Sequence, residues 1–242
     1  MKKCIVNFAK GGWYPAGQRR LRESLVENDF DGDIFTFHSE SELGPDCPSH
    51  QEAPYAFKPF ALKWAFEHGY DHVIWTDASV WAIRPIEPMF EHIEKHGWMF
   101  FLNTCTGNWT SDACLKSFSI DREQAMNIQM LMGICMGWNL THPLCRSFLN
   151  VWLEKAVDHV TFPGSWTNKH HEVSSDPRVY GHRHDQSAAS IIAWRLGMNL
   201  IVPHETYFEY YRHPNPNGPG RGLFDGNLSL VQPHTVMIAQ GM

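Results

Sequence analysis

The sequence lacks the short motifs that mark several large enzyme classes. It contains no G-x-S-x-G nucleophile elbow, no P-loop, no Rossmann G-x-G-x-x-G and no H-E-x-x-H zinc pair. The expected signals of an α/β-hydrolase, a P-loop ATPase, a dinucleotide-dependent dehydrogenase and a zinc peptidase are therefore missing. None of the six cysteines forms a C-x-x-C pair, which argues against a structural zinc framework.

An excess of basic residues and long apolar runs are also missing. Lys and Arg number 20 against 26 Asp and Glu, and the formal net charge is −6 with histidine neutral. This balance argues against a broad basic face for nucleic acid. We find no apolar run that would span a bilayer and no apolar signal-peptide core, and we expect a cytoplasmic protein unless an anchor has been removed. A Cys105–Cys114 bridge is the alternative to free thiols.

The sequence does contain short apolar runs that alternate with helical patterns. This alternation predicts a single α/β domain with a mostly parallel, mixed central sheet flanked by helices. Strands are expected at 4–9, 34–37, 72–76, 98–102, 131–138 and 200–202. Helices are expected at 18–26, 57–68, 143–157 and 186–196. Loops are expected at 103–112, 161–184 and 212–222, the last of them as a lid.

Asp77 follows directly after the predicted buried strand 72–76. Ligands of an open α/β sheet bind outside the carboxyl ends of its strands, so Asp77 is expected to face a crevice. There it would bind a divalent cation that bridges a diphosphate, because Mg²⁺ and Mn²⁺ prefer oxygen ligands. The alternative is that Asp77 caps a turn with Ser79.

Lys58 is expected at the N-terminus of a helix, immediately before Pro59. The helix dipole disfavours a lysine at that end unless an anion lies between them. A donor phosphate would supply this anion, and an ordinary surface lysine is the alternative.

Asp185 opens the predicted helix 186–196 after a long, His-rich loop. Asp is a preferred N-cap residue, so a purely structural role is one interpretation. The other is that Asp185 contacts sugar hydroxyls or deprotonates an acceptor hydroxyl.

Several segments together resemble the GT-A glycosyltransferases. The first are YAFKPFALKWA at 55–65 and GYDHVIWTDAS at 69–79. In those enzymes a Lys-Pro helix precedes a strand that ends in a metal-binding D-x-D motif. The run MGICMGWN at 132–139 is similar to their glycine-bearing acceptor-side strand, and HDQ at 184–186 is similar to a later D-Q motif near the sugar. His234 is similar to a late histidine that completes the metal site in some members.

The resemblance implies a glycosyltransferase with a nucleotide-sugar donor. Residues 1–102 would form the nucleotide-binding part and residues 103–242 the acceptor-side part. Donor binding would fall to Lys58, Asp77, Ser79 and Gln186.

Asp185 would be the catalytic residue, and Asp77 with His234 would hold Mn²⁺ or Mg²⁺. One position departs from the family pattern, because the D-x-D motif reads Asp77-Ala78-Ser79. A hydroxyl replaces the second carboxylate, and the negative charge available to a cation falls.

The sequence leaves the acceptor open among a glycan, a lipid-linked sugar, a protein and a modified nucleic-acid base, although the net acidity argues against DNA. Two other functions remain. A nucleotidyltransferase would want two or more carboxylates around Mg²⁺, and Asp77 has no close partner in sequence. A non-catalytic nucleotide-sugar-binding protein would have kept the fold and lost a metal ligand.

Overall fold

The computed structural model describes residues 1–201, 206–211, 224 and 226–240. Its strands are β1 (Lys3–Phe8), β2 (Asp33–Phe37), β3 (His72–Thr76), β4 (Val80–Ala82), β5 (Trp98–Cys105), β6 (Gln129–Asn139), β7 (Phe208–Tyr210) and β8 (Met237–Ala239). Its α-helices are α1 (Tyr14–Glu27), α2 (Phe57–Glu67), α3 (Glu87–His96), α4 (Asp112–Ser117), α5 (Arg122–Met126), α6 (Pro143–Val157) and α7 (His184–Arg195). Single 3₁₀ turns are η1 (Glu40–Leu43), η2 (Thr106–Trp109), η3 (Lys169–His171) and η4 (Leu228–Leu230).

The described strands form a five-stranded sheet in the order β2-β1-β3-β6-β5 and a three-stranded sheet in the order β4-β8-β7. In the larger sheet β1 is parallel to β2 and β3, whereas β6 is antiparallel to β3 and β5. In the smaller sheet β8 is antiparallel to β4 and parallel to β7. The predicted α/β class with a mixed central sheet is confirmed.

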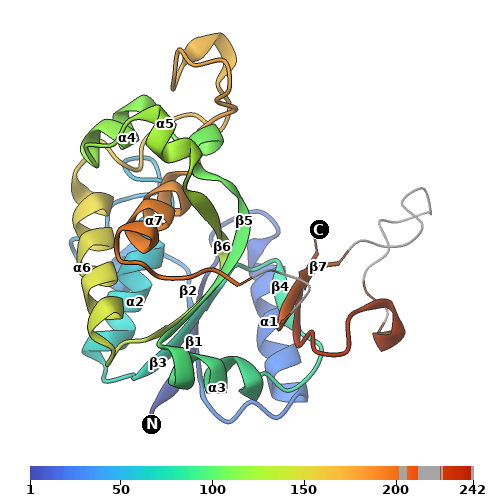
Figure 1. Ribbon diagram of the computed structural model, residues 1–242. Helices are drawn as coiled ribbons and strands as arrows, with labels where there is room; N and C mark the ends of the chain where they lie inside the picture. Colours follow the sequence, from blue (N-terminus) through green and yellow to red (C-terminus); the bar gives the residue numbers. More distant parts are fainter. Residues whose placement is uncertain (202–205, 212–223, 225, 241–242) are drawn as a thin grey trace.

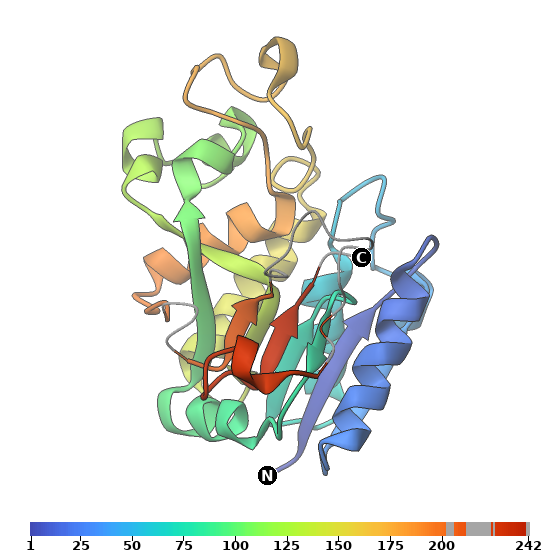
Figure 2. The same ribbon diagram turned by 90° about the vertical axis from the view of Figure 1, so that its right-hand side faces the viewer.

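The larger sheet is buried on both faces. Along β1, Cys4, Val6 and Phe8 belong to one core cluster and Ile5 to the other, because successive side chains of a strand point to opposite faces. Helices α2, α6 and α7 cover the first face, and α1 and α3 cover the second (Figure 1). The view in Figure 2 shows the smaller sheet on the side of α1 and α3, where its inner residues join the second core.

Several predicted elements agree with the structure. Strand 72–76 and helix 143–157 have the predicted bounds, and α2 is one residue shorter than predicted. Helix α1 begins earlier than predicted, at Tyr14, because Pro15 suits the first turn of a helix. Ile201 forms an isolated parallel bridge with Phe101, while Val202 and the predicted lid at 212–222 lie outside the described residues.

Two predictions about local structure are wrong. The segment 103–112 is not a loop, because β5 continues to Cys105 and η2 follows it directly. Asp185 is not an N-cap, because α7 already begins at His184 and its N-cap residue is Arg183.

The six cysteines are free, which excludes the alternative Cys105–Cys114 bridge in this structure. Among the described helices, none is long and apolar enough to cross a membrane.

A glycine lets α1 approach the turn that follows β3. A Cβ atom on Gly17 would lie 2.2 Å from the carbonyl oxygen of Ala78, a backbone atom that no side-chain rotation can remove. Residues 77–79 form this turn, so the position of the predicted site depends on the close approach of α1.

We expect Gly17→Ala to lower the free energy of unfolding by about 1–3 kcal/mol, because the methyl group overpacks this contact. Denaturant unfolding measures the loss. Ala16, the exposed neighbour of Gly17 on α1, provides the control. The free energy of unfolding of Ala16→Ser should stay within about 0.5 kcal/mol of wild type. If the Gly17→Ala protein is as stable as wild type, the turn of residues 77–79 can move to admit the methyl group without loss of stability.

Candidate functional site

A cleft of about 900 Å³ opens where β1 and β3 end. Aromatic side chains form much of its wall: Phe8, Trp13, Tyr14, Tyr55, Phe57, Trp75 and Tyr210. Asp77 and Ser79 lie in the same lining, at the place that the strand-end argument predicts for ligands of an α/β sheet. The cleft is therefore the candidate functional site.

A buried ion-pair network lies beside this cleft. The ammonium of Lys58 donates a 2.7 Å hydrogen bond to the carbonyl oxygen of Gly133 on β6. Its Nζ also lies 3.2 Å from Oδ1 of Asp77 and 3.2 Å from Oδ2 of Asp185. The contact with Gly133 is a hydrogen bond, and the two contacts with the carboxylates are ion pairs.

The network explains why a lysine is tolerated at the start of α2. The side chain of Lys58 is only 4% exposed, and the anions that offset the helix dipole are Asp77 and Asp185 of the same chain. Burial alone would lower the pKa of Lys58, but Asp185 and Asp77 outweigh it and raise that pKa. The lysine therefore stays charged, and through Asp77 it acts on the cleft indirectly.

Asp185 is the carboxylate of this network whose pKa is raised by burial. Burial raises its pKa to about 6, against the opposing effect of Lys58 and with a further increase from Asp77. The side chain is 5% exposed and is not part of the cleft lining. Gly133 packs directly against this pair, because a Cβ there would lie 3.4 Å from both Oδ2 of Asp185 and Nζ of Lys58, at van der Waals contact.

Asp77 is held in place from inside the protein. Its Oδ1 accepts a 2.8 Å hydrogen bond from Nε1 of Trp75, which lies on the same face of β3 two residues earlier. The same oxygen pairs with Lys58. The side chain is nevertheless 30% exposed and lines the cleft. Thus one carboxylate oxygen is anchored while the group as a whole remains accessible to a ligand.

The two other predicted site residues, Gln186 and His234, are not part of the cleft lining. Gln186 donates from Nε2 to the carbonyl oxygen of Leu131 at 2.7 Å and so fastens α7 to β6. His234 precedes β8, whereas Ala239 at the far end of β8 lines the cleft. The structure therefore does not bring His234 to Asp77, because the length of β8 separates them.

The histidines at the start of α7, His182 and His184, bind the backbone of the preceding loop. In His182, Nδ1 accepts from the backbone N–H of Ser111 and Nε2 lies 2.9 Å from the carbonyl oxygen of Thr161. In His184, Nδ1 lies 2.8 Å from the carbonyl oxygen of Phe162. Burial lowers the pKa to about 3 for His182 and to about 4 for His184, so both are neutral at pH 7.

The residues around Asp77 fit one kind of divalent-cation site. Within the described part of the chain no three His, Cys, Asp or Glu side chains gather into a metal cluster. Mg²⁺, however, is commonly bound by one or two carboxylates, with water and substrate phosphates as the other ligands. Asp77, with Ser79 beside it in the cleft, matches that pattern; a cage built only of protein ligands does not.

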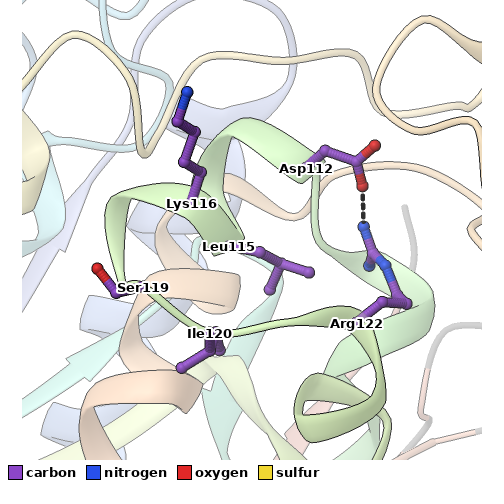
Figure 3. A pocket seen from close by; sticks show the side chains of 6 residues that line it. All are labelled: Asp112, Leu115, Lys116, Ser119, Ile120 and Arg122. Atoms are coloured by element: carbon purple, nitrogen blue, oxygen red, sulfur yellow. Dashed lines mark hydrogen bonds and ion pairs between the residues drawn. The ribbon is translucent and has the colours of Figure 1, made fainter.

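A second hollow, of about 420 Å³, lies over α4 and α5 (Figure 3). Its polar side chains include Arg122 and Asp112, which form an ion pair. Arg122 also donates to the carbonyl oxygens of Gly107 and Thr110. These bonds fasten the helices to η2, and we regard this hollow as a structural feature.

Sequence reasoning missed two parts of the site. It did not use Trp75, although its spacing of two from Asp77 puts both side chains on one face of the strand. The Gly133 carbonyl oxygen carries no side-chain signal at all. The predicted division into parts 1–102 and 103–242 stays a prediction.

Comparisons with known proteins address the fold. No protein-family model matches the chain. No curated protein matches it either.

Solved structures do match. Mouse xyloside xylosyltransferase 1 superposes with a TM-score of 0.52 at 12% identity, covering 99% of this chain and 97% of that one. The bifunctional glycosyltransferase WbbM gives 0.54 at 8% identity, covering 98% of this chain but 45% of WbbM. A glycosyltransferase involved in glycosylation of the PBCV-1 major capsid gives 0.50 at 9% identity, with coverages of 99% and 94%. The chain has the GT-A glycosyltransferase fold.

The buried network generates a stability prediction. Removing Lys58 leaves two carboxylates without their counter-ion, so Lys58→Met should lower the free energy of unfolding by about 3–5 kcal/mol. Denaturant unfolding measures this. Lys63→Met is the matched control, because Lys63 lies on the same helix in an exposed pair with Glu67 and should cost below about 0.5 kcal/mol.

A double variant checks the cause. Adding Asp185→Asn to Lys58→Met removes one of the two uncompensated charges and should recover part of the lost stability. If Lys58→Met and Lys63→Met unfold alike, the ion pairs of Lys58 do not hold this region together.

Proposed function

We propose that the protein is a glycosyltransferase that takes its sugar from a nucleotide-sugar donor bound in the cleft. The observation that carries the proposal is the Lys58 network within a GT-A fold. One buried ammonium holds the Asp77 and Asp185 carboxylates, and Asp77 remains accessible in a cleft at the ends of parallel strands. The matched structures are those of glycosyltransferases, which supports the same reaction class.

The chemistry of the cleft suits the two ends of such a donor. Its aromatic walls offer flat apolar surface for a nucleobase. Asp77, Lys58 and Asp185 together carry one net negative charge at neutral pH, which repels a diphosphate. A divalent cation held by Asp77 and the diphosphate would offset this repulsion and stabilise the charge that develops on the departing nucleoside diphosphate.

The residues of the network have separate roles in the proposal. Trp75 and Lys58 hold one oxygen of Asp77, so the carboxylate keeps a fixed orientation at the cleft. Asp185 balances Lys58 from the buried side and acts as a positioning residue. Ser79 adds a hydroxyl to the lining where a second carboxylate would stand in a full D-x-D motif.

The competing function is non-catalytic binding of nucleotide sugars. The observation in its favour is that Asp185, which the sequence predicted as the catalytic residue, is buried and outside the cleft lining. Release of nucleoside diphosphate from a panel of donors and saccharides decides between the two. Saturable donor binding without release over the whole panel would favour the binding protein.

Donor binding should depend on Asp77 and on the cation together. We expect a nucleoside diphosphate to raise the melting temperature, because a ligand of the native state stabilises it by mass action. Mn²⁺ should tighten that binding, measured by calorimetry, by about tenfold or more. In Asp77→Asn the amide keeps the shape but loses the charge, so the Mn²⁺ effect should vanish and transfer should fall by about a hundredfold or more.

Two comparisons make this test specific. Glu154→Gln removes an exposed charge on α6, outside the cleft lining, and should change neither property. Near-normal transfer by a folded Asp77→Asn protein, or no melting shift with any common nucleotide at millimolar concentration, would contradict the proposal.

The role of Asp185 is testable by an amide of equal size. In Asp185→Asn the free energy of unfolding should stay within about 1 kcal/mol of wild type or rise, since a buried amide is less costly than a buried carboxylate. Transfer should fall, because Lys58 is left with Asp77 as its only anionic partner and draws it away from the cation. Melting, transfer and Mn²⁺ enhancement are measured on the same preparation.

This outcome separates the possible roles of Asp185. A stable Asp185→Asn protein with full transfer and full Mn²⁺ enhancement would remove the residue from the machinery. If the variant loses transfer but Mn²⁺ still tightens nucleotide binding as in wild type, Asp185 contacts a substrate directly and does not act by positioning Asp77.

A further inference from the structure

An arginine guanidinium that lies over two indole rings is found near the cleft. The guanidinium carbon of Arg183 is 3.9 Å from the ring centroid of Trp109 and 4.2 Å from that of Trp166. We call these three residues the rim stack. Trp109 ends η2, Trp166 lies in the loop between α6 and α7, and Arg183 immediately precedes α7. Figure 1 shows that loop beside α4 and α5.

The backbone holds the rim stack in place. The N–H of Arg183 donates to the carbonyl oxygen of Trp109 at 3.0 Å, and the N–H of His182 donates to that of Ser165 at 2.9 Å. Gly181 lies against the segment of Trp166 so closely that a Cβ would be 1.9 Å from the Trp166 carbonyl oxygen. The stack is therefore preorganised before any ligand arrives.

The positive charge of Arg183 has no anionic partner among the described residues. Arg122 and Arg178 form ion pairs with carboxylates. Within the described part of the chain the guanidinium of Arg183 forms no ion pair or hydrogen bond, and this residue is held through its backbone N–H, which donates to Trp109 and to Oγ of Ser187. The guanidinium carbon lies over two indole rings, and the N–H groups of the guanidinium are left for a ligand. That edge matches the oxygens of a carboxylate or a phosphate.

The rim stack adjoins the candidate site on the α7 side. Tyr55 lines the cleft, and its ring centroid is 5.8 Å from that of Trp166. Arg183 also lies two residues before Asp185. Trp166 is 46% exposed, and Tyr180, which packs on Trp109, is 60% exposed. These exposed rings offer apolar surface of the kind that lines many ligand sites.

We infer that Arg183 binds a carboxylate or phosphate group of the acceptor, which makes the acceptor an acidic saccharide. This inference rests on the proposed function, because it assigns the donor to the cleft and the acceptor to the neighbouring rim stack. The anion pairs with the N–H edge of Arg183, and the exposed faces of Trp166 and Tyr180 contact the sugar ring.

Binding of matched saccharides tests the inference without requiring turnover. The probes are glucose- and galactose-terminated disaccharides in neutral, C6-carboxylate and 6-phosphate forms, titrated by calorimetry or saturation-transfer NMR. Wild-type protein should bind at least one acidic form about tenfold or more tighter than its neutral counterpart, as expected for a charge-assisted bidentate contact. The carboxylate and phosphate arms tell which anion the site prefers.

Variants locate the effect. Arg183→Leu should reduce the acidic preference to about twofold or less, and Arg183→Lys should keep only part of it, because an ammonium lacks the planar fork. Arg146→Leu, which removes an exposed charge on α6, should leave the preference unchanged. Melting temperatures verify that each variant is folded.

The outcomes separate the inference from the proposed function. If wild-type protein binds no acidic probe preferentially, or folded Arg183→Leu keeps the full preference, the inference is overturned. If the protein binds a nucleoside diphosphate but does not prefer acidic saccharides, the inference is overturned and the proposed function is not. Acidic preference without nucleotide binding contradicts the proposed function and leaves Arg183 as a saccharide-binding residue.

Discussion

The buried ammonium of Lys58 is the interaction on which the site depends. It connects the start of α2 with β6, the end of β3 and the first turn of α7. A charge removed from water is tolerated only when partners surround it closely, and here two carboxylates and a carbonyl oxygen do so. The same contacts fix Asp77 at the edge of the cleft, so the stability of the network and the geometry of the site have a common cause.

Much of the fold could be predicted from the sequence, because its longest elements have strong periodicity. The helix 143–157 and the strand 72–76 have the predicted bounds. The three-residue strands β4, β7 and β8 were not predicted, since a period of two cannot be recognised over so few residues. They exist because distant segments pair with one another, which no local pattern records.

The candidate site was predicted residue by residue but not as a unit. Lys58, Asp77 and Asp185 were each identified, but an external phosphate was expected as the counter-ion of the lysine. The counter-ions are the other two residues, brought together by the order of the strands. The rim stack could not be predicted for the same reason, because Trp109 in η2 is distant in sequence from Trp166 and Arg183, which lie in the loop before α7.

The position of β8 bears on how the protein is made. This strand lies between β4 and β7, and Ala239 and Gln240 line the cleft together with Phe8 and Lys10. During synthesis β4 has no partner in the smaller sheet until β8 leaves the ribosome, while the larger sheet already has all its strands. The nascent chain thus carries an assembled sheet beside an open edge, a state in which apolar surface is exposed to other chains. A chain that has been made only as far as residue 236 would therefore hold the Lys58 network and most of the cleft lining, but not the wall that Ala239 and Gln240 supply.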